Sequence, residues 1–426
     1  MIRDFWVQNY LSISDKQELN FVTKGPESEL VAEVSRGVFV NKLAILYGAN
    51  ASGKSNILLA MDKIFELLIT PEIDANEKIP NAYPFALTKN EPIKMHVSFY
   101  ANDCRHDYDV EFTAKYILKE TLYYYPNDSK ALFYERTFAG NGIQANIKFG
   151  SNLKLLVKTQ ERIRENTLNN HSILSICNKY SFKEDIEPFM VLYNWIMNHY
   201  HNIDGDSRRG IVNELKEVYN DERKHKFYNA MLQKADLNII DFKPIVEDRN
   251  IPQEAREIIQ KQNFPETVKE ELLLPTRETI SFTNNSENGS FEVPLELQSK
   301  GTQVFIRILG TLYDLITNNH VYFLDELGEN LHYDLLLYYL NVFLFNSEKS
   351  QLIITSQETT LLSQDLINEN RGLVWFVEKD KETASSKYAR GDSFGLHKNL
   401  SLYNSYKIGR LGAKPELGSI FIDLDE

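Results

Sequence analysis

The stretch GANASGKS, residues 48–55, constrains the fold more than any other part of the chain. It follows KLAILY (42–47), a short apolar run typical of a buried strand. It precedes a segment whose apolar residues recur at helical spacing, namely Ile57, Leu58, Met61, Ile64, Phe65 and Leu68. A buried strand, a glycine-containing turn and an amphipathic helix in this order predict an α/β fold.

The turn itself matches G-x-x-x-x-G-K-[ST], a pattern in which backbone N–H groups form a nest for phosphate. Lys54 is expected to place its charge between the β and γ phosphates of ATP, and the Ser55 hydroxyl to bind Mg²⁺. The predicted nucleotide-binding residues are Gly48, Asn50, Ala51, Ser52, Gly53, Lys54, Ser55 and Asn56.

Two adjacent carboxylates end a second apolar run, VYFLDE (321–326). The end of such a strand would place Asp325 beside the phosphate loop, where it can hold Mg²⁺, while Glu326 can activate a water as general base. An Asp-Glu pair excludes the Ras-like arrangement, in which the water is positioned from elsewhere. It leaves ring-forming AAA+ motors and ATP-binding-cassette heads.

The pentapeptide LQSKG (297–301) favours the cassette type. In cassette heads a Ser-x-Gly turn begins the helix before the Asp-Glu strand and stabilises negative charge through its hydroxyl, its N–H groups and the helix dipole. Ser299 and Gly301 have this spacing and would reach the ATP of a second subunit in a homodimer. The alternative is that Ser299 is an ordinary helix N-cap.

Two polar features follow the acids. ENLH (329–332) is expected at the dimer interface, although His332 could equally start a helix in solvent. IITSQ (353–357) is expected to end the next strand, with Gln357 as a catalytic residue that senses the γ phosphate.

The chain divides into three segments by pattern. Residues 1–150 contain the phosphate loop and, at 93–101, 106–114, 121–126 and 131–137, alternating strands of an antiparallel lobe. Residues 151–275 are rich in helix formers, with apolar residues at helical spacing over 212–235, and would be a helical insertion, and 276–426 would complete the head. A net charge of −13 argues against binding nucleic acid through bulk charge, although a local basic patch remains possible. Two distant cysteines, no signal peptide and no long apolar run predict a cytoplasmic protein that does not contact membranes.

The chain resembles cytosolic ATP-binding-cassette-type ATPases related to RecF, SMC and OLD proteins, and within them the stand-alone ATPases of bacterial abortive-infection and anti-phage systems. The similar segments, in order, are FWVQNYLSI, YGANASGKSN, ETLYYYP with LFYERT, MLQKADLNIIDF, ELQSKGTQVF, FLDELGENLH, and RGLVWFVEKD with YKIGRLGAKPE.

The resemblance implies an ABC-type (RecF/SMC-like) P-loop head with an antiparallel β lobe and a helical insertion. It implies that Lys54 and Ser55 bind nucleotide and Mg²⁺, that Asp325 and Glu326 serve metal and hydrolysis, and that Ser299 and Gly301 act across a dimer. Such ATPases commonly control a separately encoded toxic effector, often a nuclease.

Two departures from the family indicate slow hydrolysis. Gln357 stands where most relatives have histidine, and residues 56–143 contain no glutamine to contact the metal. The C-terminal FIDLDE is expected to be an acidic tail, so any nuclease would be another polypeptide. A DNA-repair or DNA-clamping ATPase is the alternative function, and a transporter ATPase the third.

Overall fold

The computed structural model describes residues 1–25, 28–72, 74–138, 145–178, 186–202, 208–397 and 399–415. The FIDLDE tail lies outside these ranges. By their contacts the residues form two compact units. The head unit comprises Met1–Asp204, Asp314–Glu329 and Leu340–Glu426, and the arm unit comprises Gly205–Tyr313 and Asn330–Tyr339. The predicted division at residues 150 and 275 stays a prediction.

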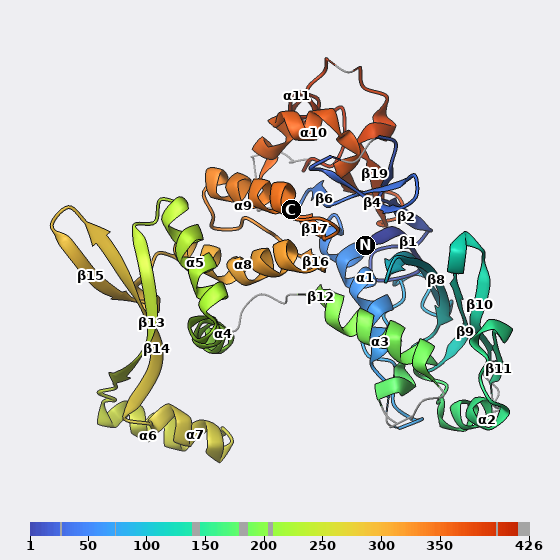
Figure 1. The fold of residues 1–426 in the computed structure, drawn as a ribbon, viewed down its shortest axis with the longest axis horizontal. Coiled ribbons are helices and arrows are strands. Elements are labelled where there is room, and N and C mark those ends of the chain that lie inside the picture. Colours follow the sequence, from blue (N-terminus) through green and yellow to red (C-terminus); the bar gives the residue numbers. More distant parts are fainter. Residues whose placement is uncertain are drawn as a thin grey trace, which may run out of the picture. The chain divides into compact units, whose positions relative to one another are not determined.

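A six-stranded sheet forms the centre of the head unit (Figure 1). Its order is β12 (Tyr200–Asn202), β16 (Val321–Leu324), β17 (Gln351–Thr355), β6 (Leu43–Gly48), β18 (Val374–Lys379) and β19 (Ser386–Arg390). All neighbours are parallel except β18 and β19. Strands β16, β17 and β6 are buried along almost their whole length, which explains their continuous apolar sequences. The predicted α/β fold is confirmed.

An antiparallel sheet forms the β lobe of the head unit. Its order is β11 (Asn146–Phe149), β10 (Ala131–Thr137), β9 (Ile117–Tyr124), β8 (Cys104–Phe112), β7 (Ile93–Ala101), β1 (Ile2–Gln8) and β2 (Gln17–Asn20). Helix α1 (Lys54–Ile69) contacts β6, β16 and β17 of one sheet and β7 of the other, so its apolar face joins both sheets into one core.

The remaining elements of the head unit are a small sheet and several helices. A small sheet has the order β3 (Val22–Thr23), β5 (Val38–Asn41) and β4 (Val31–Ser35). The other helices are α2 (Val157–Asn166), α3 (Glu187–His199), α10 (Asp365–Glu369) and α11 (Leu402–Lys407). No described helix is long and apolar enough to cross a membrane.

The arm unit combines helices with a sheet that the sequence did not reveal. The helical pattern at 212–235 is two helices, α4 (Arg208–Asn220) and α5 (Glu222–Lys234), because the Asp221 side chain accepts the N–H groups of Arg223 and Lys224 and caps α5. The antiparallel strands β13 (Ile239–Asp248), β14 (Thr276–Ser286) and β15 (Gly289–Pro294) follow, and α6 (Gln253–Lys261) and α7 (Glu266–Leu273) lie between β13 and β14 in the chain (Figure 1). Helices α8 (Lys300–Thr317) and α9 (Tyr333–Asn346) have residues in both units.

A histidine between two carboxylates makes the β lobe sensitive to pH. The His96 ring contacts Asp109 at 2.9 Å and Asp4 at 3.3 Å. Burial lowers the pKa of His96, but the hydrogen bonds and charges of Asp109 and Asp4 outweigh it and raise the pKa to about 9. Because the folded pKa lies above the unfolded value of 6.5, the charged ring stabilises the fold fully below pH 6.5 and this stability is lost as pH rises through 9.

We therefore expect the free energy of unfolding of the wild type to fall by about 3 kcal/mol more between pH 6.5 and 9.5 than that of His96→Gln. Urea unfolding at the two pH values measures this difference. His332→Gln, at a side chain that is 74% exposed, is the control and should behave like the wild type. An equal loss of stability in His96→Gln and the wild type would contradict the assignment.

Candidate functional site

The phosphate-loop motif joins the central strand of the parallel sheet to the helix that links both sheets. Gly48 ends β6, and Lys54 is the first residue of α1. Gly53 is the N-cap of α1 with φ +107°, a left-handed backbone conformation that glycine adopts without strain. The N-terminus of α1 therefore opens onto the loop, as the anion nest requires.

Lys54 is buried within this loop, with 6% of its surface exposed. Its ammonium donates to the carbonyl oxygens of Gly48 and Ala49, at 2.8 and 3.2 Å. Burial lowers the pKa of Lys54, while the charges of Glu326 and Asp325 act to raise it. The strand–loop–helix and the strand with the two acids are therefore brought together.

The loop also contains a polar atom without a partner. Ser52 Oγ is buried and has no hydrogen-bond partner among the residues that the structure describes. A buried cation, an unpaired hydroxyl and a free helix N-terminus are the groups that a polyphosphate anion would satisfy. The residues of the loop fit ATP.

The order of the strands brings the acids to the loop. Strand β17 lies between β6 and β16, so its last residue, Thr355, stands beside the end of β16. Thr355 Oγ1 donates to the Asp325 carboxylate and accepts the N–H of Glu326 at 2.7 Å. Glu326 has φ +52°, a strained conformation for a residue other than glycine, and the Thr355 hydroxyl holds it there.

Gln357, two residues beyond β17, is exposed and touches the predicted base directly. Its Nε2 donates to Glu326 Oε1 at 2.8 Å. The structure thus gives Gln357 a contact that its predicted role in γ-phosphate sensing did not include.

A divalent cation would find few protein ligands here. Ser55, half-buried in the first turn of α1, and Asp325 are the predicted ligands. Within the described ranges no cluster of three or more His, Cys, Asp or Glu side chains could hold a metal ion. One hydroxyl and one carboxylate suit Mg²⁺, which keeps several waters and binds substrate phosphates.

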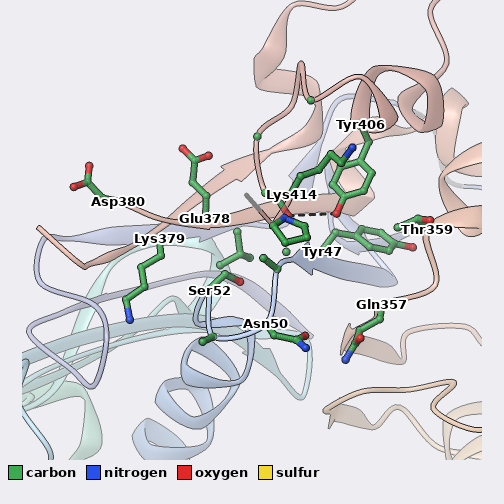
Figure 2. A pocket seen from close by; sticks show the side chains of 18 of the residues that line it. Tyr47, Asn50, Ser52, Gln357, Thr359, Glu378, Lys379, Asp380, Tyr406 and Lys414 are labelled. Carbon is green, nitrogen blue, oxygen red and sulfur yellow. Dashed lines mark hydrogen bonds between the residues drawn. The ribbon is translucent and has the colours of Figure 1, made fainter. Parts of the chain in front are cut away.

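A cavity of about 1110 Å³ lies beside the loop (Figure 2). The loop residues Asn50 and Ser52, the exposed Gln357, and charged residues at and just after the end of β18 are among the residues that line it (Figure 2). Its lining residues are Tyr47, Gly48, Ala49, Asn50, Ala51, Ser52, Ser356, Gln357, Thr359, Val377, Glu378, Lys379, Asp380, Lys381, Tyr406, Gly409, Gly412, Ala413, Lys414 and Pro415.

The Ser-x-Gly turn belongs to the arm unit. Ser299 Oγ accepts the N–H of Thr302 at 3.1 Å, so Ser299 does cap α8, as the alternative interpretation expects. A Cβ on Gly301 would lie 2.9 Å from the Asn330 carbonyl oxygen, so the turn and the ENLH segment pack against each other and position 301 requires glycine. His332 is exposed beside Asp334. A role of Ser299 and Gly301 across a dimer stays a prediction.

Sequence reasoning missed four hydroxyl-bearing residues of the head unit that hold this site, namely Ser12, Thr355, Ser386 and Tyr388. Thr355 could have been found as the polar residue that ends β17. Ser386 and Tyr388 contact the loop, and Ser12 contacts Ser386 and Asn56, from distant parts of the chain, and these three residues carry no local pattern.

Comparison with known proteins gives a family and a set of distant folds. Residues 43–363 match the family described as "AAA domain, putative AbiEii toxin, Type IV TA system". No curated protein matches the sequence.

Among solved structures, the chain is similar to the SMC head domain from Thermotoga maritima, with 13% identity, a TM-score of 0.40, and coverage of 91% of this chain and 98% of that one. It is also similar to the Smc head domain with an extended coiled coil from Pyrococcus furiosus, bound to the C-terminal domain of ScpA, with 12% identity, a TM-score of 0.37, and coverage of 96% and 98%. The match to the family model over residues 43–363 runs from the first residue of β6 past the end of β17 and covers most of the chain. The chain therefore belongs to the AAA-domain family described as "AAA domain, putative AbiEii toxin, Type IV TA system".

Proposed function

We propose that the chain binds and slowly hydrolyses ATP. The observation that carries the proposal is the arrangement around Thr355, whose hydroxyl fixes Asp325 and Glu326 at the end of β16. The two carboxylates lie near enough to Lys54 for their charges to act on its pKa. Lys54 and the N–H groups of the loop would bind the phosphates, and the Glu326 carboxylate would orient a water and accept its proton. Mg²⁺, held by Ser55 and Asp325, would neutralise charge on the β and γ phosphates.

The Gln357 side chain would bind both Glu326 and the γ phosphate of ATP. A side-chain amide has two N–H donors, and one of them already binds Glu326. The other can bind a γ-phosphate oxygen, although it cannot supply the charge of an imidazolium. This difference supports slow turnover, which suits a switch better than a motor. Release of phosphate from ATP by the purified protein tests the proposal, and its absence with Mg²⁺ present would refute hydrolysis.

We further propose a homodimer in which Ser299 and Gly301 of one protomer contact the ATP of its partner. The position of the turn at the start of the 18-residue helix α8 supports this role, because the positive dipole end and those first-turn N–H groups that Ser299 does not cap can face an anion. Larger homo-oligomers would be built from such dimers.

Ser299→Arg is expected to leave ATP binding to each protomer intact and to prevent ATP-driven dimerisation, because the long cationic side chain would fill the interface. Sedimentation with Mg²⁺ and a non-hydrolysable ATP analogue measures the association. Ser290→Arg, at an exposed position of β15, is the matched control and should dimerise like the wild type. Dimerisation of Ser299→Arg at wild-type concentrations would sink the role across the interface.

The biological setting that we propose is cytoplasmic anti-phage defence by abortive infection. The chain would sense infection and use its nucleotide state to restrain or release a separately encoded toxic effector of the nuclease class. The family description, which names a toxin and a type IV toxin–antitoxin system, supports a setting of growth arrest.

Co-expression with the neighbouring genes tests this setting. Growth should arrest on phage infection only with the complete gene set, and Lys54→Ala should abolish control of the arrest. Arrest by this chain alone would show that it is itself the toxic component. Tight, salt-sensitive binding of duplex DNA by the purified chain would instead favour a DNA-clamping function.

A further inference from the structure

Three hydroxyl groups from distant parts of the head unit lie beside the phosphate loop and the start of α1. Ser386 and Tyr388 lie on β19, and Ser12 lies between β1 and β2. Ser386 Oγ donates to the Ser52 carbonyl oxygen at 2.6 Å, and the Tyr388 hydroxyl donates to the Gly53 carbonyl oxygen at 2.7 Å. Two successive carbonyl groups of the loop are thus held by one strand.

The hydroxyl protons of this cluster can be placed. Ser386 has one hydroxyl proton, which goes to Ser52, so in its 2.6 Å contact with Ser12 it must accept. Ser12 therefore donates to Ser386 and in turn accepts from the Asn56 amide at 2.6 Å. The hydrogen bonds form a chain in one direction, from the first turn of α1 back to the loop.

The Tyr388 hydroxyl is also a hydrogen-bond donor to the loop. Burial raises its pKa far above the ordinary value, so the hydroxyl keeps its proton and remains a donor over the whole working pH range. Both contacts therefore act on the loop carbonyls as donors.

Because the peptide bond is planar, holding the carbonyl groups of Ser52 and Gly53 also fixes the directions of the N–H groups that follow them. In a trans peptide the C=O of one residue and the N–H of the next point in opposite directions. The Ser52 carbonyl shares a peptide with the Gly53 N–H, and the Gly53 carbonyl shares one with the Lys54 N–H. Pulling both carbonyls toward β19 turns both N–H groups away from it, to the side where the anion nest forms.

We propose that Ser386 and Tyr388 are positioning residues that orient the N–H groups of Gly53 and Lys54 toward the bound phosphates, with Ser12 holding Ser386 in place. This proposal rests on the proposed function, because it needs ATP in the loop. The close approach supports it, since a Cβ on Gly53 would lie 2.1 Å from Ser386 Oγ and 2.8 Å from Ser12 Oγ. Glycine at position 53 thus makes room for the hydroxyls as well as for the loop conformation.

The test uses Ser386→Ala and Tyr388→Phe, each of which removes one hydroxyl oxygen. Ser385→Ala, at the neighbouring buried serine whose hydroxyl contacts Thr383, is the matched control. Binding of Mg²⁺ with a non-hydrolysable ATP analogue is measured by calorimetry, and the amide proton shifts of Gly53 and Lys54 are followed by NMR in the same proteins. Thermal unfolding without nucleotide reports the stability of each variant.

Each variant is expected to bind the analogue about tenfold more weakly, with an unfolding midpoint no lower than that of Ser385→Ala. The NMR readout should separate the two contacts. Ser386→Ala should reduce the nucleotide-induced downfield shift of the Gly53 amide proton, and Tyr388→Phe that of the Lys54 amide proton.

Wild-type affinity and shifts in both variants would overturn the proposal while leaving ATP binding standing. Equal effects of both variants on both amides, or a loss of affinity that only follows a loss of stability, would show a merely structural role. No binding by the wild type would remove the proposed function, and this inference with it.

Discussion

Lys54→Ala is expected to reduce ATP affinity at least about a hundredfold, which abolishes binding at ordinary concentrations. The ammonium is held inside the loop by two loop carbonyls and would donate charge-assisted hydrogen bonds to the β and γ phosphates. Such bonds contribute about 1.5–3 kcal/mol each, so the loss of two gives this magnitude. Equilibrium titration with a fluorescent ATP analogue measures the effect.

Lys63→Ala is the matched control. Lys63 lies on the same helix, its side chain is 2% exposed, and its ammonium is paired with Glu66 at 3.0 Å. Its removal changes a buried lysine of α1 without touching the loop, so stability should fall while ATP affinity stays at the wild-type value. Comparable affinities for Lys54→Ala and Lys63→Ala would rule out the assigned role of Lys54.

Glu326→Gln is expected to retain ATP binding and to lose hydrolysis by a factor of about 10² to 10⁴, the range that a general base contributes. The amide keeps the size and shape of the side chain, and its oxygen can still accept the hydrogen bond from Gln357. What is lost is the ability to take a proton from water. The variant should therefore accumulate as a stable ATP-bound dimer, which single-turnover assays and sedimentation would detect.

Glu348→Gln provides the comparison, because Glu348 is an exposed carboxylate of the head unit that lies outside the phosphate loop, the acid pair and the ENLH segment. It should hydrolyse ATP at the wild-type rate. If Glu326→Gln also turned over within a few-fold of the wild type, another group would have to be the base.

Local patterns predicted those parts of the fold that neighbouring residues determine. Alternation gave the bounds of β7 and β10, and the apolar run before the phosphate loop gave β6. The break at Asp221 was missed because a polar residue at an N-cap interrupts the backbone without interrupting the helical spacing of apolar residues.

Strands β13 and β14 were missed for a related reason. Only Ile239 and Phe242 of β13 and residues 279–282 of β14 are buried, so the apolar alternation of each strand is too short to stand out, and β13 also contains Pro244.

For the candidate site, sequence motifs predicted Lys54, Asp325 and Glu326, because each of these residues belongs to a short contiguous pattern. Contacts such as that between Ser386 and Ser52 join residues more than 300 positions apart and depend on the register of β19. Nothing in the neighbourhood of Ser386 distinguishes it from any other serine in a strand.

The left-handed turn at Glu326 makes the order of the two acids matter. The Thr355 hydroxyl donates its one proton to Asp325 and accepts the N–H of Glu326. These two hydrogen bonds fix the Asp325 carboxylate and the backbone of Glu326. A longer acid at 325 would crowd the threonine, and a shorter acid at 326 would fall short of the Gln357 amide. Exchanging aspartate and glutamate would preserve the total charge at the end of β16 and still break these contacts. The lengths of the two side chains, rather than the number of negative charges, decide which partners they reach.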